Sequence, residues 1–275
     1  MKRLLILLGC ILILLLIPMF LWFLEERSDL EIVIIDKTVP DETYREHQGT
    51  VWVLNHFRHA KKAIHPAKDY YGFVPNERNQ TYDIRELPES YDDVDVIYMT
   101  DSYGVYEDDV PWLHPNRERE GARSSLLYGG VEMKEWMAIY NRLTSEKKST
   151  FILEFNSFAS PTEKSVRDSM TRFLNIDWSG WIGRYFDELN PDLNLEIPQW
   201  ILDTYADQWN YEGPGFVLVN EYTGELVVLL DQEHTLSKGI KLTYTEKGQN
   251  KFGLTESLII STGLILFKQR IRMMF

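Results

Sequence analysis

The sequence predicts an α/β protein: a doubly wound, mostly parallel sheet with helices on both faces, behind an N-terminal transmembrane helix. Three observations predict this class. Short apolar runs rich in β-branched residues alternate with helical stretches, strand-then-helix units succeed one another three times, and these strands end in or next to acidic residues. Parallel strands are buried on both faces and read as continuous apolar runs. Successive strand-helix units need crossover connections, which favour a parallel sheet covered on both sides.

Residues 1–28 predict a cytoplasmic tip followed by a transmembrane signal anchor. An apolar run from Leu4 to Leu24 follows Lys2 and Arg3. At about 1.5 Å per residue this run spans roughly the 30 Å of a bilayer's hydrocarbon core. The positive charges before the run place the N-terminus in the cytoplasm and the bulk of the chain outside, with Trp22 at the outer interface. The alternative, a cleaved signal peptide, is disfavoured because no small-residue cleavage site follows the run.

Composition narrows the partners and the compartment. The chain has 275 residues, 44% of them hydrophobic, a net charge of -13 and a sequence pI near 5.0. Such an acidic protein has no basic footprint for a phosphate backbone, so nucleic acid is not an expected partner. Cys10 is the only cysteine, so the outer part has no disulfide. This pattern indicates a single-pass protein of a bacterial cell membrane.

The first strand-helix unit follows the anchor and opens the α/β domain predicted for residues 29–232. The run LEIVIID predicts a buried strand that ends in Asp36. After Pro40, apolar residues within 51–57 recur at helical spacing and predict a helix. Residues 64–93 are rich in Tyr, Pro, Asn and charge and predict a long loop.

The second unit begins with the run DVIYMTD, a predicted buried strand that ends in Asp101. The stretch VEMKEWMAIYNRL, introduced by Gly129 and Gly130, predicts an amphipathic helix. Its spacing places four large residues on one side: Met133, Trp136, Met137 and Tyr140.

The third unit is the stretch FILEFNSFASPTEKSVRDSM. Residues 151–155 predict a strand. Ser160, Pro161 and Glu163 match the N-cap, N1 and N3 positions of a capping box, so a helix is expected to begin at Pro161. Apolar residues of this helix are expected to face the sheet: Val166, Met170, Phe173 and Leu174.

Downstream segments predict one more helix and several strands. IPQWILDTYADQW predicts a helix that starts at Pro198, and FVLVNEYTGELVVLLD predicts two strands about Gly224 that complete or extend the sheet. IKLTYTE predicts a further strand. Residues 233–275 form a β-rich extension. Its run 258–267 is too short to span a bilayer, which leaves an edge strand, an interfacial helix, or a truncated or frameshifted end as alternatives.

The order of these motifs resembles a known family. EIVIID, DVIYMTDSYGVY, LLYGGVEMKEW, FILEFNSFASPTEKSVRDSM and WSGWIGRY are similar to class I glutamine-amidotransferase-like α/β domains, in a branch of membrane-anchored bacterial envelope proteins. The resemblance covers about residues 29–232 and implies an amidotransferase-like, flavodoxin-like three-layer fold. The family carries a nucleophilic cysteine in the turn after a central strand. Here the matching turn holds Asn156, Ser157 and Phe158, so the resemblance does not imply glutamine amidotransferase activity.

Three acidic residues are the candidate site residues of the chain. Asp36, Asp101 and Glu154 lie at or near the carboxyl ends of predicted parallel strands, where side chains of neighbouring strands converge on one crevice. Asp101 and Glu154 are the candidate catalytic pair, because a glycoside hydrolase needs two carboxylates about 5 to 10 Å apart. The alternative is that these acids cap loops or pair with cations such as Arg184.

Aromatic and amide side chains in the same predicted loops are candidate ligand contacts. Flat rings beside carboxylates and amides are typical of a sugar-binding cleft, because rings cover apolar C-H faces while acids accept hydroxyl hydrogen bonds. Burial in the core is the alternative for the rings. With Asp36, the candidate ligand-binding residues are Tyr103, Tyr106, Tyr128, Asn156, Trp181 and Arg184.

Taken together, these features predict a membrane-tethered extracytoplasmic domain that binds an envelope glycan or a partner protein without catalysis. Two alternatives remain open: a carboxylate-dependent hydrolase acting on envelope polysaccharide, and a structural scaffold of a membrane complex. No motif in the sequence predicts a metal site or a cofactor.

Overall fold

The fold is described from a computed structural model. The described residues are 2–113, 124–231, 233–235, 240–255, 257–260 and 263–269.

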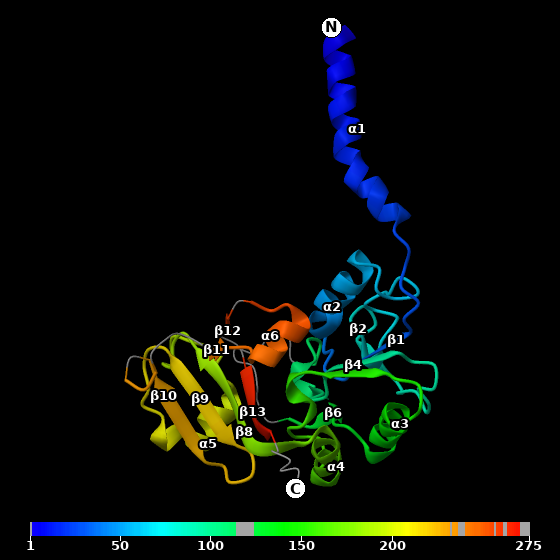
Figure 1. Ribbon diagram of the computed structural model, residues 1–275. Coiled ribbons are helices and arrows are strands. Elements are labelled where there is room, and N and C mark those ends of the chain that lie inside the picture. Colours follow the sequence, from blue (N-terminus) through cyan, green and yellow to red (C-terminus); the bar gives the residue numbers. More distant parts are fainter. Residues whose placement is uncertain are drawn as a thin grey trace.

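The N-terminal helix α1 (Lys2–Leu24) projects away from the rest of the protein (Figure 1). Its segment Ile6–Leu24 contains no charged residue and is exposed along its length. The predicted N-terminal apolar helix is therefore confirmed, and it is long and apolar enough to cross a membrane. Which side of a membrane each end faces stays a prediction.

A five-stranded mixed sheet forms the centre of the N-terminal half. Its order is β3-β2-β1-β4-β7, in which β1 is parallel to β2 and β4, β4 is parallel to β7, and only β3 is antiparallel to its neighbour. The predicted α/β class with mostly parallel strands is confirmed. The strands are β1 (Ile32–Asp36), β2 (Tyr71–Asn76), β3 (Thr81–Arg85), β4 (Val96–Asp101) and β7 (Thr150–Leu153).

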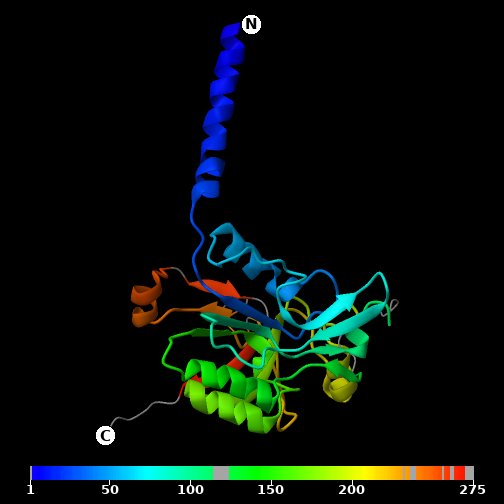
Figure 2. The same ribbon diagram turned by 90° about the vertical axis from the view of Figure 1, so that its right-hand side faces the viewer.

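Helices cover both faces of this sheet because neighbouring residues of each central strand point to opposite sides. On one face, Ile34 and Tyr98 pack with Val51 of α2. On the other, Ile35 and Met99 belong to the cluster that contains the α3 and α4 side chains. Figure 2 shows α3 and α4 side by side on the face opposite α2. These helices are α2 (Arg45–His56), α3 (Met133–Leu143) and α4 (Lys164–Leu174).

The loop predicted at 64–93 is wrong in part, because this segment contains the hairpin of β2 and β3. Gly72 and Pro75 interrupt the apolar pattern of β2, which hides the strand in the sequence. Gly72 has φ +139°, and a Cβ at this position would lie 1.8 Å from the Asp36 carbonyl oxygen. This glycine therefore allows β2 to approach the end of β1.

The predicted start of α4 is also wrong, because the helix begins at Lys164 and not at Pro161. The residues before it serve tertiary contacts instead of a capping box. The Ser160 N-H donates to Glu221 Oε2 at 3.0 Å, and Thr162 Oγ1 accepts from the Val131 N-H at 3.1 Å. Val166 and Met170 are buried as predicted, whereas Phe173 is 38% exposed and packs against α3 through Trp136 and Tyr140.

The buried face of α3 differs from the predicted one. Trp136 is fully buried, but Met133 and Met137 are exposed. Glu135 turns inward instead, where its carboxylate accepts from Lys37 Nζ at 2.7 and 2.8 Å. Burial lowers the pKa of Lys37, an effect that the nearby Glu135 charge opposes. A buried ion pair between β1 and α3 thus sets the rotation of this helix.

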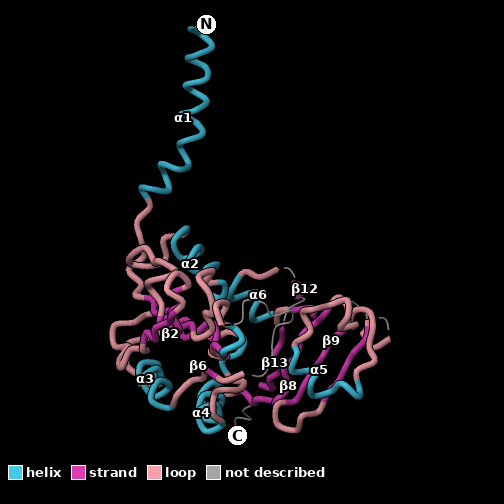
Figure 3. The backbone as a smooth tube through the Cα atoms, turned by 180° about the vertical axis from the view of Figure 1, so that it is seen from behind, coloured by secondary structure: helices cyan, strands magenta, loops and turns pink. Residues whose placement is uncertain are grey.

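A second, antiparallel sheet lies beside the first, with the order β10-β9-β8-β13 (Figure 3). The hairpin of β9 and β10 joins β8 in this sheet, so the prediction that it extends the parallel sheet is wrong. β8 is long enough to pair with β9 and β13 at once. Helix α5 (Gln199–Tyr205) packs on this sheet. Its strands are β8 (Ile176–Phe186), β9 (Gly215–Asn220), β10 (Leu226–Leu230) and β13 (Gly263–Gln269).

Among the alternatives for the C-terminal run, the edge strand is observed for β13, which pairs with β8. The predicted strand IKLTYTE is present in part, since β11 (Ile240–Leu242) pairs with β12 (Leu258–Ile260). The remaining described elements are β5 (Val105–Tyr106), β6 (Leu126–Tyr128), the 3-10 segments η1 (Glu107–Asp109), η2 (Phe155–Ser157) and η3 (Ala206–Gln208), and helix α6 (Glu246–Phe252).

Candidate functional site

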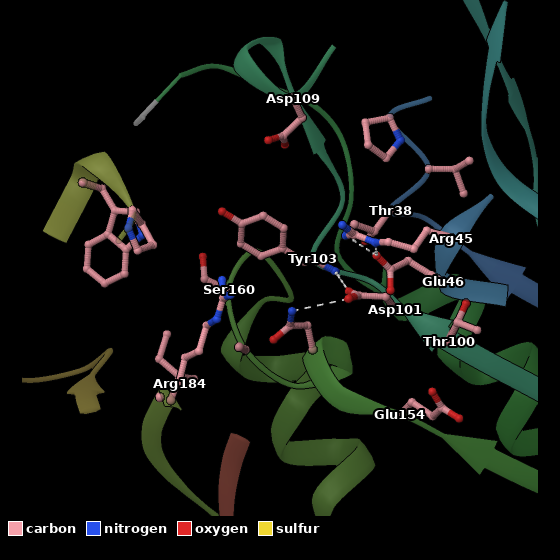
Figure 4. Close-up of a pocket in the computed structure, with 18 of the residues that line it drawn as sticks. Thr38, Arg45, Glu46, Thr100, Asp101, Tyr103, Asp109, Glu154, Ser160 and Arg184 are labelled. Atoms are coloured by element: carbon pink, nitrogen blue, oxygen red, sulfur yellow. Dashed lines mark hydrogen bonds and ion pairs between the residues drawn. The ribbon is translucent and has the colours of Figure 1, made fainter. Parts of the chain in front are cut away.

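A cavity of about 1040 Å³ lies between the carboxyl ends of β1, β4 and β7 and the strands β8 and β9 with helix α5 (Figure 4). The chain leaves β1 through α2 toward β2 on one side and leaves β4 through α3 toward β7 on the other. Such a divergence opens a crevice at the carboxyl ends of the two strands, the usual ligand position in α/β sheets. The second sheet forms the opposite wall of this open cavity.

Asp101 is the last residue of β4 and lines the cavity, although its side chain is only 6% exposed. Its Oδ1 accepts from the Tyr103 N-H at 2.6 Å, and its Oδ2 accepts from Asn156 Nδ2 at 3.3 Å. Burial raises the pKa of Asp101 to about 6, and the charge of Asp36 adds to this rise. The carboxyl therefore exchanges its proton close to neutral pH.

Asp36, the last residue of β1, is fully buried and lies behind the cavity wall. Its Oδ2 is 2.6 Å from Nδ1 of His47, which is also fully buried. His47 Nε2 lies 2.9 Å from the Pro66 carbonyl oxygen, which can only accept, so Nε2 carries a proton. The Asp36 carboxylate, predicted to bind a ligand, is thus hydrogen-bonded to His47 and does not line the cavity.

Thr38 connects the two aspartates. The Thr38 N-H donates to Asp36 Oδ1 at 3.0 Å, and its hydroxyl hydrogen-bonds to the Asp101 carboxyl. The same Oγ1 accepts from the Gly104 N-H at 2.8 Å. Gly104 has φ +94°, and a Cβ there would lie 2.2 Å from the Tyr128 carbonyl oxygen, so this turn requires glycine. Sequence reasoning missed Thr38, for which only its position two residues after a strand-end acid was a signal.

Glu46 and Arg45 form a charged pair on the α2 side of the cavity. Arg45 Nε donates to Glu46 Oε1 at 2.8 Å, and both residues line the cavity. Figure 4 shows this pair next to Thr38 and Asp101. The charge of Glu46 contributes to the raised pKa of Asp101. The sequence analysis did not single out Glu46, because it lies in the first turn of a helix and not at a strand end.

Glu154 follows β7 and lines the same cavity, but its side chain is exposed and turned away from Asp101 (Figure 4). Its Oε1 accepts from the Tyr98 hydroxyl at 2.9 Å. Burial, together with the neighbouring Glu154, raises the pKa of Tyr98, so this phenol stays a donor. The structure therefore places the predicted pair on one cavity without a mutual contact among the described hydrogen bonds.

Of the predicted aromatic residues, one lines the cavity and three do not. Tyr103 lines the cavity, and Tyr106 packs behind it with a ring-centroid distance of 5.0 Å. Tyr128 lies under Lys37, whose Nζ is 4.8 Å from the ring centroid. Trp181 is half-buried in β8. The other aromatic residues among the described cavity-lining residues are Phe186 of β8, which is buried, and Trp200 of α5; neither was among the predicted site residues.

The two remaining predicted contacts, Asn156 and Arg184, both line the cavity. Asn156 bonds to Asp101 as described above. Arg184 enters from β8, forms an ion pair with Glu196 and lies over the Phe186 ring at 5.0 Å. The alternative to a site was that the strand-end acids cap loops or pair with cations such as Arg184. Loop capping is observed, since Asp36 and Asp101 each accept from the N-H two residues further on, whereas no pairing with Arg184 occurs among the described ion pairs.

Among the described residues that line the cavity, acids outnumber cations. The arginines in this set are Arg45 and Arg184, and each has a carboxylate partner. The cavity-lining acids are Asp41, Glu46, Asp101, Asp109, Glu154 and Glu221. The cavity therefore favours ligands without negative charge.

A buried ion pair holds the second sheet against the first. Arg167 of α4 bonds to Glu221, which follows β9, and both side chains are largely buried. Glu221 Oε1 also accepts from Trp178 Nε1 at 3.0 Å, and its Oε2 accepts from the Ser160 N-H at 3.0 Å. These contacts join the loop after β7, the start of β8 and the turn after β9. They fix the distance between the two walls of the cavity.

Within the described part of the chain, no group of three or more His, Cys, Asp or Glu side chains is arranged to hold a metal ion. Comparison with protein-family models, with curated proteins and with solved structures finds no match.

Proposed function

We propose that this protein is a membrane-tethered, extracytoplasmic α/β domain of a bacterial envelope that binds a glycan in the cavity without cleaving it. The observation that carries the proposal is the convergence of a carboxyl, an amide and two aromatic side chains on one cavity of about 1040 Å³. Asp101 and Asn156 supply hydrogen-bonding groups, while Tyr103 and Trp200 supply flat apolar faces. Sugar rings need both kinds of contact at once.

The charge of the cavity narrows the ligand class. Carboxylates accept hydrogen bonds from hydroxyl and ammonium groups, and an acidic surplus repels anionic ligands. Neutral or amino-sugar glycans are therefore favoured over anionic polysaccharides.

A carboxylate-dependent hydrolase is the second candidate, and the raised pKa of Asp101 favours it. A carboxyl with a pKa of about 6 is partly protonated near neutral pH and suits a general acid. The sequence-predicted partner is Glu154, but Glu46 is the cavity carboxylate whose charge acts on Asp101. We assign Glu46 as the second carboxylate of this alternative.

The relation to amidotransferase-like domains stays a proposal, supported by the mostly parallel strand order of the first sheet. In the turn after β7, the buried Ser157 hydroxyl donates to the Glu154 carbonyl oxygen at 2.8 Å. The Ser157 hydroxyl is therefore hydrogen-bonded to the backbone of its own turn and has no general base beside it among the described contacts. This argues against Ser157 as the nucleophile of an acyl transfer.

The test is binding of the full-length protein, held in lipid nanodiscs, to purified neutral, amino-sugar and anionic polysaccharides. Asp101→Asn and Trp200→Ala are each expected to weaken binding about tenfold, a loss of roughly 1.4 kcal/mol. Asp192→Asn, in an exposed loop outside the cavity lining, is the matched control and should bind as wild type. Release of reducing ends, abolished by Asp101→Asn, would instead support the hydrolase. A folded protein that binds none of these glycans contradicts the proposal and leaves a partner protein or a scaffold role.

A further inference from the structure

The end of α2 lies directly against the base of the N-terminal helix α1. The Trp22 indole N-H donates to the His56 carbonyl oxygen, and Arg58 Nη1 donates to the Trp22 carbonyl oxygen at 3.1 Å. The Arg58 guanidinium also lies 5.2 Å from the Trp22 ring centroid. Figures 1 and 2 both show α2 on the side of the protein from which α1 projects. A membrane crossed by α1 would therefore face the C-terminal end of α2.

Large apolar side chains are exposed at the end of α2. Trp52 of the helix is 60% exposed, Phe57 at its C-cap is 53% exposed, and Val53 of the helix is also exposed. The Trp52 ring stacks on His56 with a centroid distance of 4.8 Å, so the patch continues to the Trp22 contact. Val51, in contrast, points into the protein core. Single exposed apolar residues are common, but a contiguous patch beside a membrane-crossing helix indicates an interaction surface.

Positive charges surround this patch in a protein that is strongly acidic overall. Arg58, Lys61 and Lys62 follow α2, and Arg27 lies in the connection from α1. Lys61 and Lys62 have carboxylates at 3.6 and 3.7 Å, but these are exposed pairs that exchange readily with other anions. The ammonium groups of Lys61 and Lys62 are exposed donors, which suit the phosphate oxygens of a headgroup.

We propose that this face of α2 docks on the bilayer that α1 crosses. Trp52, Val53 and Phe57 enter the interfacial region, and Lys61 and Lys62 bind the phosphates of anionic lipids, while Arg58 holds the end of α2 to Trp22. Aromatic side chains and cations are the residue types that membrane interfaces select. The inference rests on the membrane anchoring in the proposed function but not on glycan binding.

The short connection between α1 and β1 favours the lipid bilayer over a separate partner protein as the binding partner of this α2 face. Residues 25–31 join α1 to β1 and reach at most about 25 Å when fully extended. The α2 face cannot leave the vicinity of the bilayer, so even weak contacts with lipid form as an intramolecular step at high effective concentration.

The experiment places a fluorescent probe on this face in the full chain. Cys10→Ser removes the only cysteine, and Val53→Cys then accepts a single environment-sensitive NBD label. The protein is reconstituted in phosphatidylcholine vesicles, with or without phosphatidylglycerol, that contain lipids spin-labelled near the headgroup. We expect strong quenching at position 53, stronger with phosphatidylglycerol. The matched control is Lys134→Cys on α3, an exposed helical site on the opposite face of the sheet, where quenching should be near background.

Second variants separate the two contributions. Trp52→Ala with Phe57→Ala should reduce quenching at position 53 by at least about half in both lipids, whereas Lys61→Gln with Lys62→Gln should remove the gain from phosphatidylglycerol. All four side chains are exposed, so the fold should be retained. A chain that floats with the vesicles after alkaline extraction but shows equal, low quenching at positions 53 and 134 overturns the docking alone. A chain that does not float overturns both the anchoring and the docking.

Discussion

Two aspartates at equivalent strand ends have different hydrogen-bond partners in this protein. Asp36 and Asp101 each end a parallel strand. Asp36 lies within hydrogen-bond distance of the His47 ring, whereas Asp101 receives only neutral donors from Tyr103, Asn156 and Thr38 in the described contacts. A buried carboxylate with neutral donors keeps a raised pKa, and its ionised form is held at a cost in stability. Asp101 is thus the buried strand-end acid that a ligand in the cavity can contact, and a hydrogen bond from such a ligand would stabilise its ionised form.

Asp101→Asn is expected to stabilise the protein while weakening ligand binding. Because the pKa of Asp101 in the folded protein is about 6, above its ordinary value near 4, the folded state binds more protons than the unfolded state between these pH values. The stability contribution of Asp101 therefore falls as pH rises from about 4 through 6. Asparagine keeps an acceptor for the Tyr103 N-H without charge. We expect a gain of about 1 to 3 kcal/mol in the free energy of unfolding at pH 7.5, measured by urea denaturation of the full chain in micelles.

The same variant should flatten the pH dependence of stability between pH 4 and 6. Asp192→Asn is the control and should leave both the free energy and its pH dependence unchanged, because Asp192 is exposed. A loss of stability in Asp101→Asn at pH 7.5 would show that the ionised carboxylate is a structural partner and not a strained functional group.

At the scale of elements, periodicity predicted the existence of strands and helices better than their limits or faces. β1, β4 and α3 follow the predicted runs closely because their patterns are strong. The start of α4 could not be read from the capping motif, since Ser160 and Thr162 bond to Glu221 and Val131, which lie far away in the sequence. The inward face of α3 follows from the Glu135 contact with Lys37, which apolar spacing cannot reveal.

Glu221→Gln tests the buried link between α4 and the second sheet. The change leaves the Arg167 guanidinium buried without its carboxylate, which costs about 3 to 5 kcal/mol for buried pairs. We expect an equivalent fall in the free energy of unfolding by urea denaturation, together with weakened ligand binding, because Glu221 positions one cavity wall.

The matched control is Asp168→Asn, which removes the exposed pair of Lys164 and Asp168 on the same helix. Exposed pairs four residues apart contribute about 0.5 kcal/mol or less, so this variant should be close to wild type. Equal losses in Asp168→Asn and Glu221→Gln would contradict the assigned role of the buried pair.

At the scale of the whole molecule, a three-layer α/β unit stands beside an antiparallel sheet, and α1 projects from one side (Figure 1). The cavity is a property of this arrangement, since its walls come from both sheets. Neither sheet alone encloses the site, so ligand binding should depend on their relative position. The face of α2 toward α1 is a second surface, for which we proposed docking on a membrane.

The predicted orientation can be measured with one cysteine in intact cells. In a Cys10→Ser background, Lys134→Cys places a thiol on the exposed surface of α3. Because Lys2 and Arg3 favour a cytoplasmic N-terminus, we expect a membrane-impermeant maleimide to label this thiol without lysis. Labelling that requires lysis would place the domain in the cytoplasm and contradict an envelope ligand, whereas the unmodified Cys10→Ser protein reports background.

The apolar helix α1, the mostly parallel α/β class and the strand ends that carry Asp36 and Asp101 can be read from the amino-acid sequence alone. These features depend on local periodicity and on runs of apolar residues, which a linear chain displays directly. Three features required the folded chain: the hairpin of β9 and β10 forms a second sheet, Glu46, Thr38 and Trp200 line the same cavity as Asp101, and Asp36 is paired with His47. Hydrogen bonds, burial and pKa shifts depend on groups that are distant in the sequence, and these groups come together only when the chain folds.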